Sequence, residues 1–132
     1  MLRCELRRNY VAGGSFGCGG GAIQLQLGAT ATIRDSTLNE NAARGGAKIS
    51  IGGAISTLPN ARLTVHGSEL CHNVVVGDSD YTNGGAVLVQ TSVRFVVSDS
   101  LLCHNRAEQT GVGGAYGGAV ATLNSAVLTV ER

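Results

Sequence analysis

The chain contains the stretch Leu70-Cys71-His72-Asn73 and, shortly after it, Gly84-Gly85-Ala86-Val87, and both patterns return at a fixed spacing. The first pattern, Leu-x-x-Asn, occurs at 6–9, 38–41, 70–73 and 102–105, with a step of 32 residues each time. The second pattern, Gly-Gly-Ala-aliphatic, occurs at 20–23, 52–55, 84–87 and 117–120, with steps of 32, 32 and 33 residues. Repeats of this length predict a solenoid in which each period forms one coil.

Apolar and polar residues alternate between these markers at the same phase in every repeat, which is typical of β-strands. Two columns of equivalent positions are predicted to face inward: Ala31, Leu63, Phe95 and Leu128, and Ile33, Val65, Val97 and Val130. Further inward columns are Val11, Ala43, Val75 and Ala107 after each Asn, and Ile23, Ile55, Val87 and Val120 after each glycine pair. About three short strands per period are expected, and no helix. Stacking them about 4.8 Å apart gives an all-β, right-handed parallel β-helix of about four coils.

We expect residues 1–132 to form a single β-helix segment, in which residues 1–19 end a preceding coil. The following coils are expected at 20–51, 52–83 and 84–116, with a partial coil at 117–132 and the one extra residue between Arg106 and Tyr116. Both ends start or stop inside a normal repeat. Because open solenoid ends need protection, we expect a longer solenoid, with further coils or protein partners covering the ends.

The composition agrees with a narrow interior, since the chain has 20 Gly, one Pro, no Trp, three Tyr and two Phe. Ten basic and nine acidic residues are scattered along the chain, so no nucleic-acid partner is expected. No apolar run approaches the ~20 residues that span a bilayer, so no membrane span is expected. Residues 1–8 also lack the apolar core of a secretory signal.

The repeated polar and glycine positions suggest structural roles. A stacked amide ladder is predicted for Asn9, Asn41, Asn73 and Asn105. Corners with positive φ or close backbone approach are predicted at the glycine pairs, namely Gly20, Gly21, Gly52, Gly53, Gly84, Gly85, Gly117 and Gly118.

These paired motifs resemble the repeats of the polymorphic outer-membrane proteins of chlamydiae, which carry Gly-Gly-Ala-aliphatic and Phe-x-x-Asn motifs. Here the first motif is kept four times, whereas the second has Leu in place of Phe, as at Leu70 to Asn73. The resemblance covers nearly the whole chain. It implies a right-handed parallel β-helix that serves as an adhesive or structural surface, with an extracellular or cell-surface location and no catalytic residues or cofactors to carry over.

Two Cys-His pairs, Cys71-His72 and Cys103-His104, are candidate metal ligands because one coil step brings the pairs about 4.8 Å apart. Adjacent strand residues point to opposite faces, so all four converge only in a turn. We therefore favour simple stacking of repeats, ahead of a Cys71–Cys103 disulfide and ahead of a metal site. Cys4 and Cys18 are expected to be two small apolar thiols, although a bridge between them would close the first loop.

Many carbohydrate-active enzymes use this fold, so paired carboxylates are of interest. Asp35 and Asp99 share a column but lie two coils apart, about 9.6 Å, near the upper limit for inverting glycosidases. Turn formation explains both better. The pair Asp78 and Asp80 around Ser79 is a weak calcium candidate, and no Ser-His-Asp grouping or nucleotide motif is evident.

A non-enzymatic β-helix that presents side-chain ladders for adhesion or assembly is therefore the expected function. The main alternative is a β-helix that binds or cleaves carbohydrate, which makes surface carbohydrate a possible partner. A minor alternative is ice binding on the column Thr32, Thr64, Val96 and Thr129, although the neighbouring column, Thr30, Arg62, Arg94 and Val127, lacks a second row of Thr.

Overall fold

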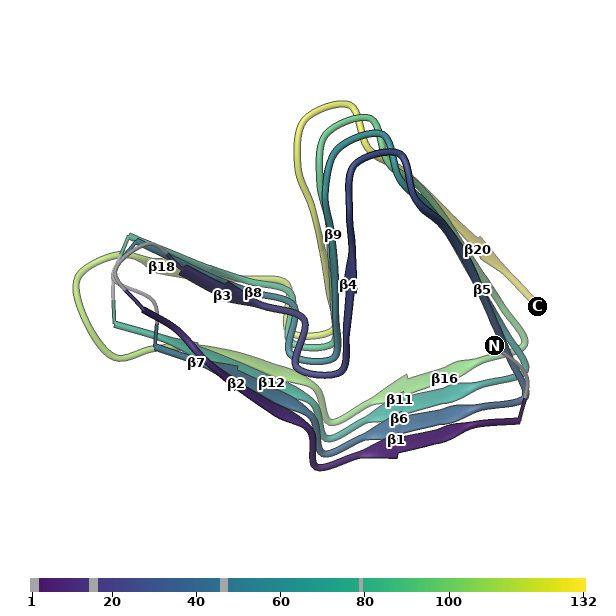
Figure 1. The fold of residues 1–132 in the computed structure, drawn as a ribbon, viewed down its shortest axis with the longest axis horizontal. Helices are drawn as coiled ribbons and strands as arrows, with labels where there is room; N and C mark the ends of the chain where they lie inside the picture. The colour runs from purple at the N-terminus through teal and green to yellow at the C-terminus, as the bar shows by residue number, and fades with distance from the viewer. Residues whose placement is uncertain (1–2, 15–16, 46–47, 79) are drawn as a thin grey trace.

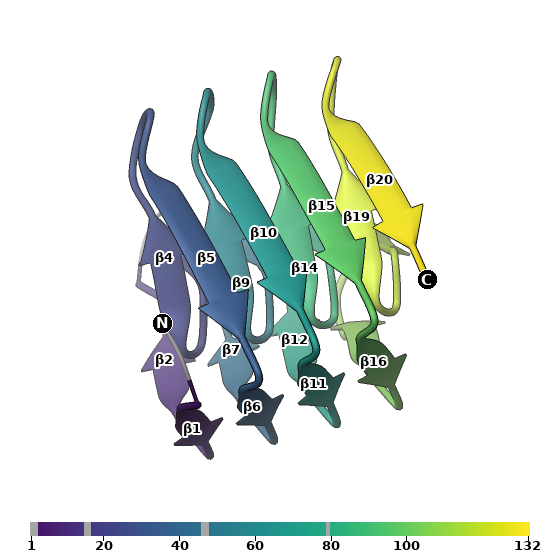
Figure 2. The ribbon, with the colours of Figure 1, turned by 90° about the vertical axis from the view of Figure 1, so that its right-hand side faces the viewer.

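The computed structural model describes residues 3–14, 17–45, 48–78 and 80–132. Over these residues the chain folds into a right-handed parallel β-helix, with one period of the sequence in each coil (Figures 1 and 2). Its described regular elements are all strands, and none is a helix that could span a membrane. The fold class predicted from the repeat is therefore confirmed.

Each coil adds one strand to each of five four-stranded sheets. The first sheet contains β1 (Glu5–Arg7), β6 (Thr37–Asn39), β11 (Glu69–Cys71) and β16 (Leu101–Cys103). The second contains β2 (Tyr10–Ala12), β7 (Ala42–Arg44), β12 (Val74–Gly77) and β17 (Arg106–Gln109). The third contains β3 (Gly17–Gly19), β8 (Ile49–Ile51), β13 (Tyr81–Asn83) and β18 (Gly114–Tyr116). The fourth contains β4 (Ile23–Leu25), β9 (Ile55–Thr57), β14 (Val87–Val89) and β19 (Val120–Thr122), and the fifth β5 (Thr30–Arg34), β10 (Arg62–His66), β15 (Arg94–Ser98) and β20 (Val127–Glu131).

The expectation of about three strands per coil was wrong, because each coil has five. The strands of the first and third sheets are all three residues long, too short to show a period of two. In the third sheet the buried position is small or polar, as in Cys18, Ser50 and Thr82, and the apolar side chains face out. This inverted pattern conceals the strand in the sequence.

The coil has two lobes in cross-section (Figure 1). The first, fourth and fifth sheets enclose the main lobe, whose core includes Leu70, Val87 and Phe95. The second and third sheets form a side lobe with a smaller core of Cys18, Ala43 and Val75. The chain crosses between the lobes twice in each coil, once after the first sheet and once after the third.

Left-handed backbone turns the chain at equivalent places in successive coils. The corner before the second sheet has positive φ at Arg8, Glu40, His72 and His104, between 51° and 59°. The corner before the first sheet has positive φ, between 47° and 54°, at Arg3, Asp35, Gly67 and Asp99. Because each such residue bends the chain at the same point of the period, the coils superimpose and their strands pair in register (Figure 1).

The predicted inward columns are confirmed in the interior coils. Leu63 pairs with Phe95 and Val65 pairs with Val97, and all four side chains are buried. Leu128 and Val130 occupy the same columns in the strand β20, but they are exposed because no described coil stacks on that side of them.

The extra residue of the third period can be located from the strand register. Gly77 pairs with Gln109, which is a step of 32, whereas Tyr81 pairs with Gly114, which is a step of 33. The insertion therefore lies between Gln109 and Gly114, inside the predicted segment. It lengthens the turn at the tip of the side lobe, where extra loop length costs little.

Replacing the largest core side chain should reveal how much the main lobe depends on packing. Phe95 is fully buried, so Phe95→Ala should lower the free energy of unfolding by about 3–5 kcal/mol. Its exposed neighbour provides the control, since Arg94→Ala should change that free energy by less than about 0.5 kcal/mol. Urea denaturation followed by circular dichroism measures both, and equal losses would contradict the assigned facing.

Candidate functional site

An asparagine ladder occupies the corner between the first and second sheets. The backbone N–H of Asn41 and its Nδ2 both donate to Oδ1 of Asn73, each at 3.0 Å. Asn73 repeats this with Oδ1 of Asn105, at 2.9 and 3.0 Å. Asn9 does the same with Asn41. The structure thus brings the four predicted ladder residues together.

Each interior amide of this ladder is fully hydrogen-bonded. Nδ2 of Asn73 donates a second bond to the carbonyl oxygen of Leu38 at 2.8 Å, and Oδ1 of Asn73 accepts two bonds from Asn41. Asn41 and Asn73 are both completely buried. A buried amide with all its donors and acceptors used avoids a desolvation penalty, so the ladder holds the corner in one geometry.

A second ladder, of serine hydroxyls, was not predicted. The backbone N–H groups of Cys4, Ser36 and Ser68 donate to Oγ of Ser36, Ser68 and Ser100, each at 3.1 Å. Each of these hydroxyls in turn donates to the carbonyl oxygen two residues before it. The signal was present as Ser at a spacing of 32 residues, but a column of Ser does not show by itself which backbone groups it pairs.

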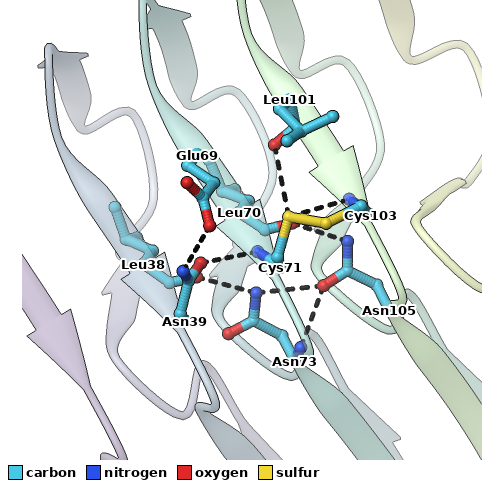
Figure 3. Close-up of a disulfide and its surroundings, with 9 residues drawn as sticks. All are labelled: Leu38, Asn39, Glu69, Leu70, Cys71, Asn73, Leu101, Cys103 and Asn105. Atoms are coloured by element: carbon cyan, nitrogen blue, oxygen red, sulfur yellow. Dashed lines mark hydrogen bonds between the residues drawn. A yellow bond between two sulfur atoms is a disulfide. The ribbon is translucent and has the colours of Figure 1, made fainter.

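A disulfide joins Cys71 to Cys103 on the outer face of the first sheet (Figure 3). The preference for simple stacking of these residues was therefore wrong. The reason is geometric: pairing of β11 with β16 sets the two Cα atoms 4.6 Å apart, within the range that a disulfide spans. Both side chains also point the same way, because Leu70 and Leu102 point toward the core.

The disulfide continues a row of side-chain acceptors. Oδ1 of Asn39 accepts a bond from the backbone N–H of Cys71 at 2.7 Å. One coil further on, Sγ of Cys71 accepts from the backbone N–H of Cys103 at 3.2 Å (Figure 3). Oε1 of Glu69 accepts from Nδ2 of Asn39 at 2.6 Å and completes the row.

Cys4 and Cys18 are not bonded to each other, as expected, and both are thiols. Cys18 is buried in the side lobe, and its Sγ lies 3.5 Å from Oγ of Ser50. Burial raises the pKa of the Cys18 thiol. At neutral pH this residue is therefore a protonated core side chain and a poor nucleophile.

His72 and His104 follow the two bridged cysteines at the left-handed corner. Their rings stack with centroids 4.8 Å apart and an angle of 17° between planes, and both side chains are exposed. The other two residues of this column, Arg8 and Glu40 in the preceding coils, form an ion pair at 2.8 Å. This bond is the main reason that the pKa of the Glu40 carboxyl is lowered.

The glycine pairs form the corner between the third and fourth sheets. The first glycine of each pair, such as Gly52, has positive φ. The second, such as Gly53, has no room for a side chain, because a Cβ there would lie 2.7 Å from the backbone of Val74. The two crossings between the lobes therefore touch at a waist, formed by the glycine pairs and the residues that follow the Asn ladder.

A groove runs along the outside of this waist, in the angle between the third and fourth sheets. Its wider part has a volume of about 680 Å³ and is lined by Ile49, Tyr81, Asn83, Gln90 and Tyr116 among others. A second hollow of about 360 Å³ shares Ile49 and Ile51 with it and continues to Gln24. Sequence reasoning missed this groove, because one of its two walls is formed by the inverted strands of the third sheet.

Two tyrosines are prominent in the groove. Tyr81 is 55% exposed and Tyr116 is 56% exposed, and they lie in adjacent strands, β13 and β18. The described side chains that line the groove are apolar, aromatic, or carry neutral amide and hydroxyl groups. The groove is thus an uncharged surface with two aromatic rings and several hydrogen-bonding groups.

The carboxylates considered for catalysis lie elsewhere. Asp35 and Asp99 occupy left-handed positions at the corner between the fifth and first sheets, at the opposite side of the main lobe from the groove (Figure 1). Gly67 lies between them in the column, and Oδ1 of Asp35 would be 2.8 Å from a Cβ at that glycine. Their positions suit turn formation.

Beside Asp99 the structure does assemble a Ser, a His and an Asp, a grouping that the sequence did not reveal. Nδ1 of His66 lies 2.9 Å from Oγ of Ser98 and 3.3 Å from Oδ2 of Asp99. Both contacts use the same ring nitrogen, whereas a catalytic relay needs the Asp on one nitrogen and the Ser on the other. The group therefore lacks the arrangement of a catalytic triad.

Two further candidates from the sequence are less informative. The column Thr32, Thr64, Val96 and Thr129 lies on the outer face of the fifth sheet beside Arg62 and Arg94. An ice-binding surface would present flat, parallel rows of Thr, and the arginines in the neighbouring column do not fit such a surface. The calcium candidate around Asp78 and Asp80 includes Ser79, which lies outside the described residues.

Comparison of the chain with protein-family models, with curated proteins and with solved structures finds no match.

The amide ladder can be tested by an isosteric change. Asn73→Asp removes the two bonds that Nδ2 donates to Leu38 and Asn105, and it turns a carboxylate oxygen toward Oδ1 of Asn105. We expect the free energy of unfolding at pH 7 to fall by about 3 kcal/mol or more. The matched control is Asn60→Asp, at an exposed left-handed position, which should have almost no effect. Similar urea midpoints for the two variants would argue against a structural role for the ladder.

The disulfide closes a loop of 32 residues. Replacing both bridged residues, Cys71→Ser with Cys103→Ser, should lower the free energy of unfolding by roughly 3–4 kcal/mol under oxidising conditions. The wild-type chain should fall to the level of the variant when a reductant is added. Peptide mapping without reductant should show Cys71 linked to Cys103, with Cys4 and Cys18 alkylated after denaturation. Alkylation of all four cysteines in the oxidised chain would contradict this pairing.

Proposed function

We propose that the chain is a non-enzymatic β-helical segment for adhesion at a cell surface, and that its groove holds an extended, uncharged carbohydrate chain. The observation that carries this proposal is the pair of exposed tyrosines, Tyr81 and Tyr116, which lie on adjacent strands and line the same part of the groove. Exposed aromatic residues in a concave surface are unusual unless something binds there.

The chemistry of the groove matches a neutral sugar chain. The apolar faces of sugar rings pack on tyrosine rings, and their hydroxyl groups pair with amides such as Asn83 and Gln90. A charged polymer would instead call for Arg, Lys or carboxylates along the lining. Because the groove follows the stacking direction, a linear chain can contact several coils at once.

Two other features support a surface role. The Cys71–Cys103 disulfide is of the kind that persists in oxidising compartments, which include the cell exterior. The resemblance of the repeats to the chlamydial surface proteins implies the same location.

The alternative of polysaccharide cleavage has weaker support. Asp35 and Asp99 lie at the corner between the fifth and first sheets, so neither carboxylate reaches a sugar chain in the groove. Binding without cleavage fits the described residues better.

Affinity electrophoresis tests this proposal with three neutral polysaccharides, a β-glucan, a xylan and a mannan. At least one should retard the wild-type chain, and Tyr81→Ala or Tyr116→Ala should weaken that binding by about tenfold or more, as for aromatic residues at the centre of an interface. Tyr10, which is 61% exposed on β2 and outside the groove, supplies the control, because Tyr10→Ala should bind normally. Normal migration in all three gels, or an equal loss from the Tyr10 variant, would refute binding in the groove.

A further inference from the structure

The corner that carries His72 and His104 places two imidazoles one coil apart in a fixed geometry. Both residues have left-handed backbone, with φ of 57° and 51°. This conformation turns the side chains at the end of each strand, so they no longer follow the alternation of β11 and β16. The rings stack with centroids 4.8 Å apart, and both are exposed to solvent.

A cysteine sulfur lies next to this pair. Sγ of Cys103 and one ring nitrogen from each of His72 and His104 all lie within 4.8 Å of one another. The objection that neighbouring strand residues point to opposite faces does not apply here, because each His occupies the turn and each Cys the strand. In the oxidised chain this sulfur is bonded to Cys71 and is not available as a thiolate ligand.

We propose that reduction of the Cys71–Cys103 disulfide creates a site for one borderline transition-metal ion, of which Zn²⁺ is the representative, with His72, His104 and Cys103 as ligands. The site would connect two adjacent coils at their outer corner. It is separate from the groove and does not rest on the proposed carbohydrate binding.

The ligand set and its spacing suit this class of metal. Zinc binds imidazole nitrogen at about 2.0–2.1 Å and thiolate sulfur at about 2.3 Å, so tetrahedral ligand atoms stand roughly 3.3–3.6 Å apart. Small side-chain rotations would bring the three atoms to that separation, and the two imidazoles have room to rotate because both are exposed at the corner. Three protein ligands leave a fourth position, which water fills, as in open zinc sites.

The chemical step balances in electrons and atoms. Two thiols of a reductant give two electrons to the Cys71–Cys103 bond and become a disulfide themselves, and their protons pass to the two cysteine sulfurs. The metal ion then replaces the proton on Sγ of Cys103, while both histidines bind as neutral imidazoles. Oxidation reverses the process, because it removes the thiolate and leaves only the two histidines.

The test uses the full chain, reduced with a phosphine and desalted without oxygen, and titrated with Co²⁺ and Zn²⁺ alone. The phosphine takes its oxygen from water, whose hydrogens complete the two thiols. We expect one Co²⁺ per reduced chain, a thiolate-to-cobalt charge-transfer band, and displacement by Zn²⁺. The oxidised chain should show no such band and at least about tenfold weaker Zn²⁺ binding in competition with a chromophoric chelator.

Variants assign the ligands. His72→Asn and His104→Asn keep a residue that tolerates left-handed backbone, and each should weaken Zn²⁺ binding at least about tenfold. Cys103→Ser should abolish the charge-transfer band. The matched control His66→Asn removes the third histidine, which lies at another corner, and Cys4→Ser removes another thiol, so both should bind as the wild-type chain does.

Three results would overturn the proposal. These are a reduced chain without the charge-transfer band, a band that survives Cys103→Ser, or equal losses from His66→Asn and His104→Asn. Equal Zn²⁺ affinity of the oxidised and reduced chains would overturn the role of the thiolate. Circular dichroism spectra that match the wild type exclude unfolding as the cause of any loss.

Discussion

The remaining structure depends on the contact at the waist, where the glycine pairs at 20–21, 52–53 and 84–85 touch the backbone of the residue after a ladder Asn. A Cβ at Gly53 would overlap the backbone of Val74 and the carbonyl group of Gly85 in the next coil. Because no side chain fits there, the coil is pinched into two lobes, and the third and fourth sheets meet at an inward angle. The groove lies in the angle between these two sheets. The groove and the pattern of glycines therefore have the same physical cause.

Three kinds of hydrogen-bonded or covalent link join the coils, and they lie at two corners of the period. Asn41 and Asn73 fix the corner before the second sheet, whereas Ser36 and Ser68 fix the corner before the first. The disulfide adds a covalent link near the first of these corners. Strand pairing alone could slip by a residue, but a buried amide displaced by one position would lose its partners, so these ladders specify the register.

Much of the fold could be predicted from the sequence, because a repeat of 32 residues reports the register directly. Leu63, Val65 and Phe95 were placed correctly, since their period of two is visible over the five residues of each strand. The groove could not be predicted, because Ile49 and Tyr81 flank small or polar buried residues and reverse the usual pattern. The disulfide was underestimated for another reason: sequence gives the column of Cys71 and Cys103 but not the side-chain direction at a strand end.

The Asn ladder also gives the solenoid a direction. The bonds between the ladder side chains all run one way, because Nδ2 of Asn9, Asn41 and Asn73 each donates to Oδ1 of the Asn in the next coil. The local dipoles of the side chains therefore add along the axis. A coil that joins beyond Asn105 must offer an acceptor, and one that joins before Asn9 must offer a donor. The two ends of the ladder therefore differ in hydrogen-bonding capacity, and two identical ends would not match each other.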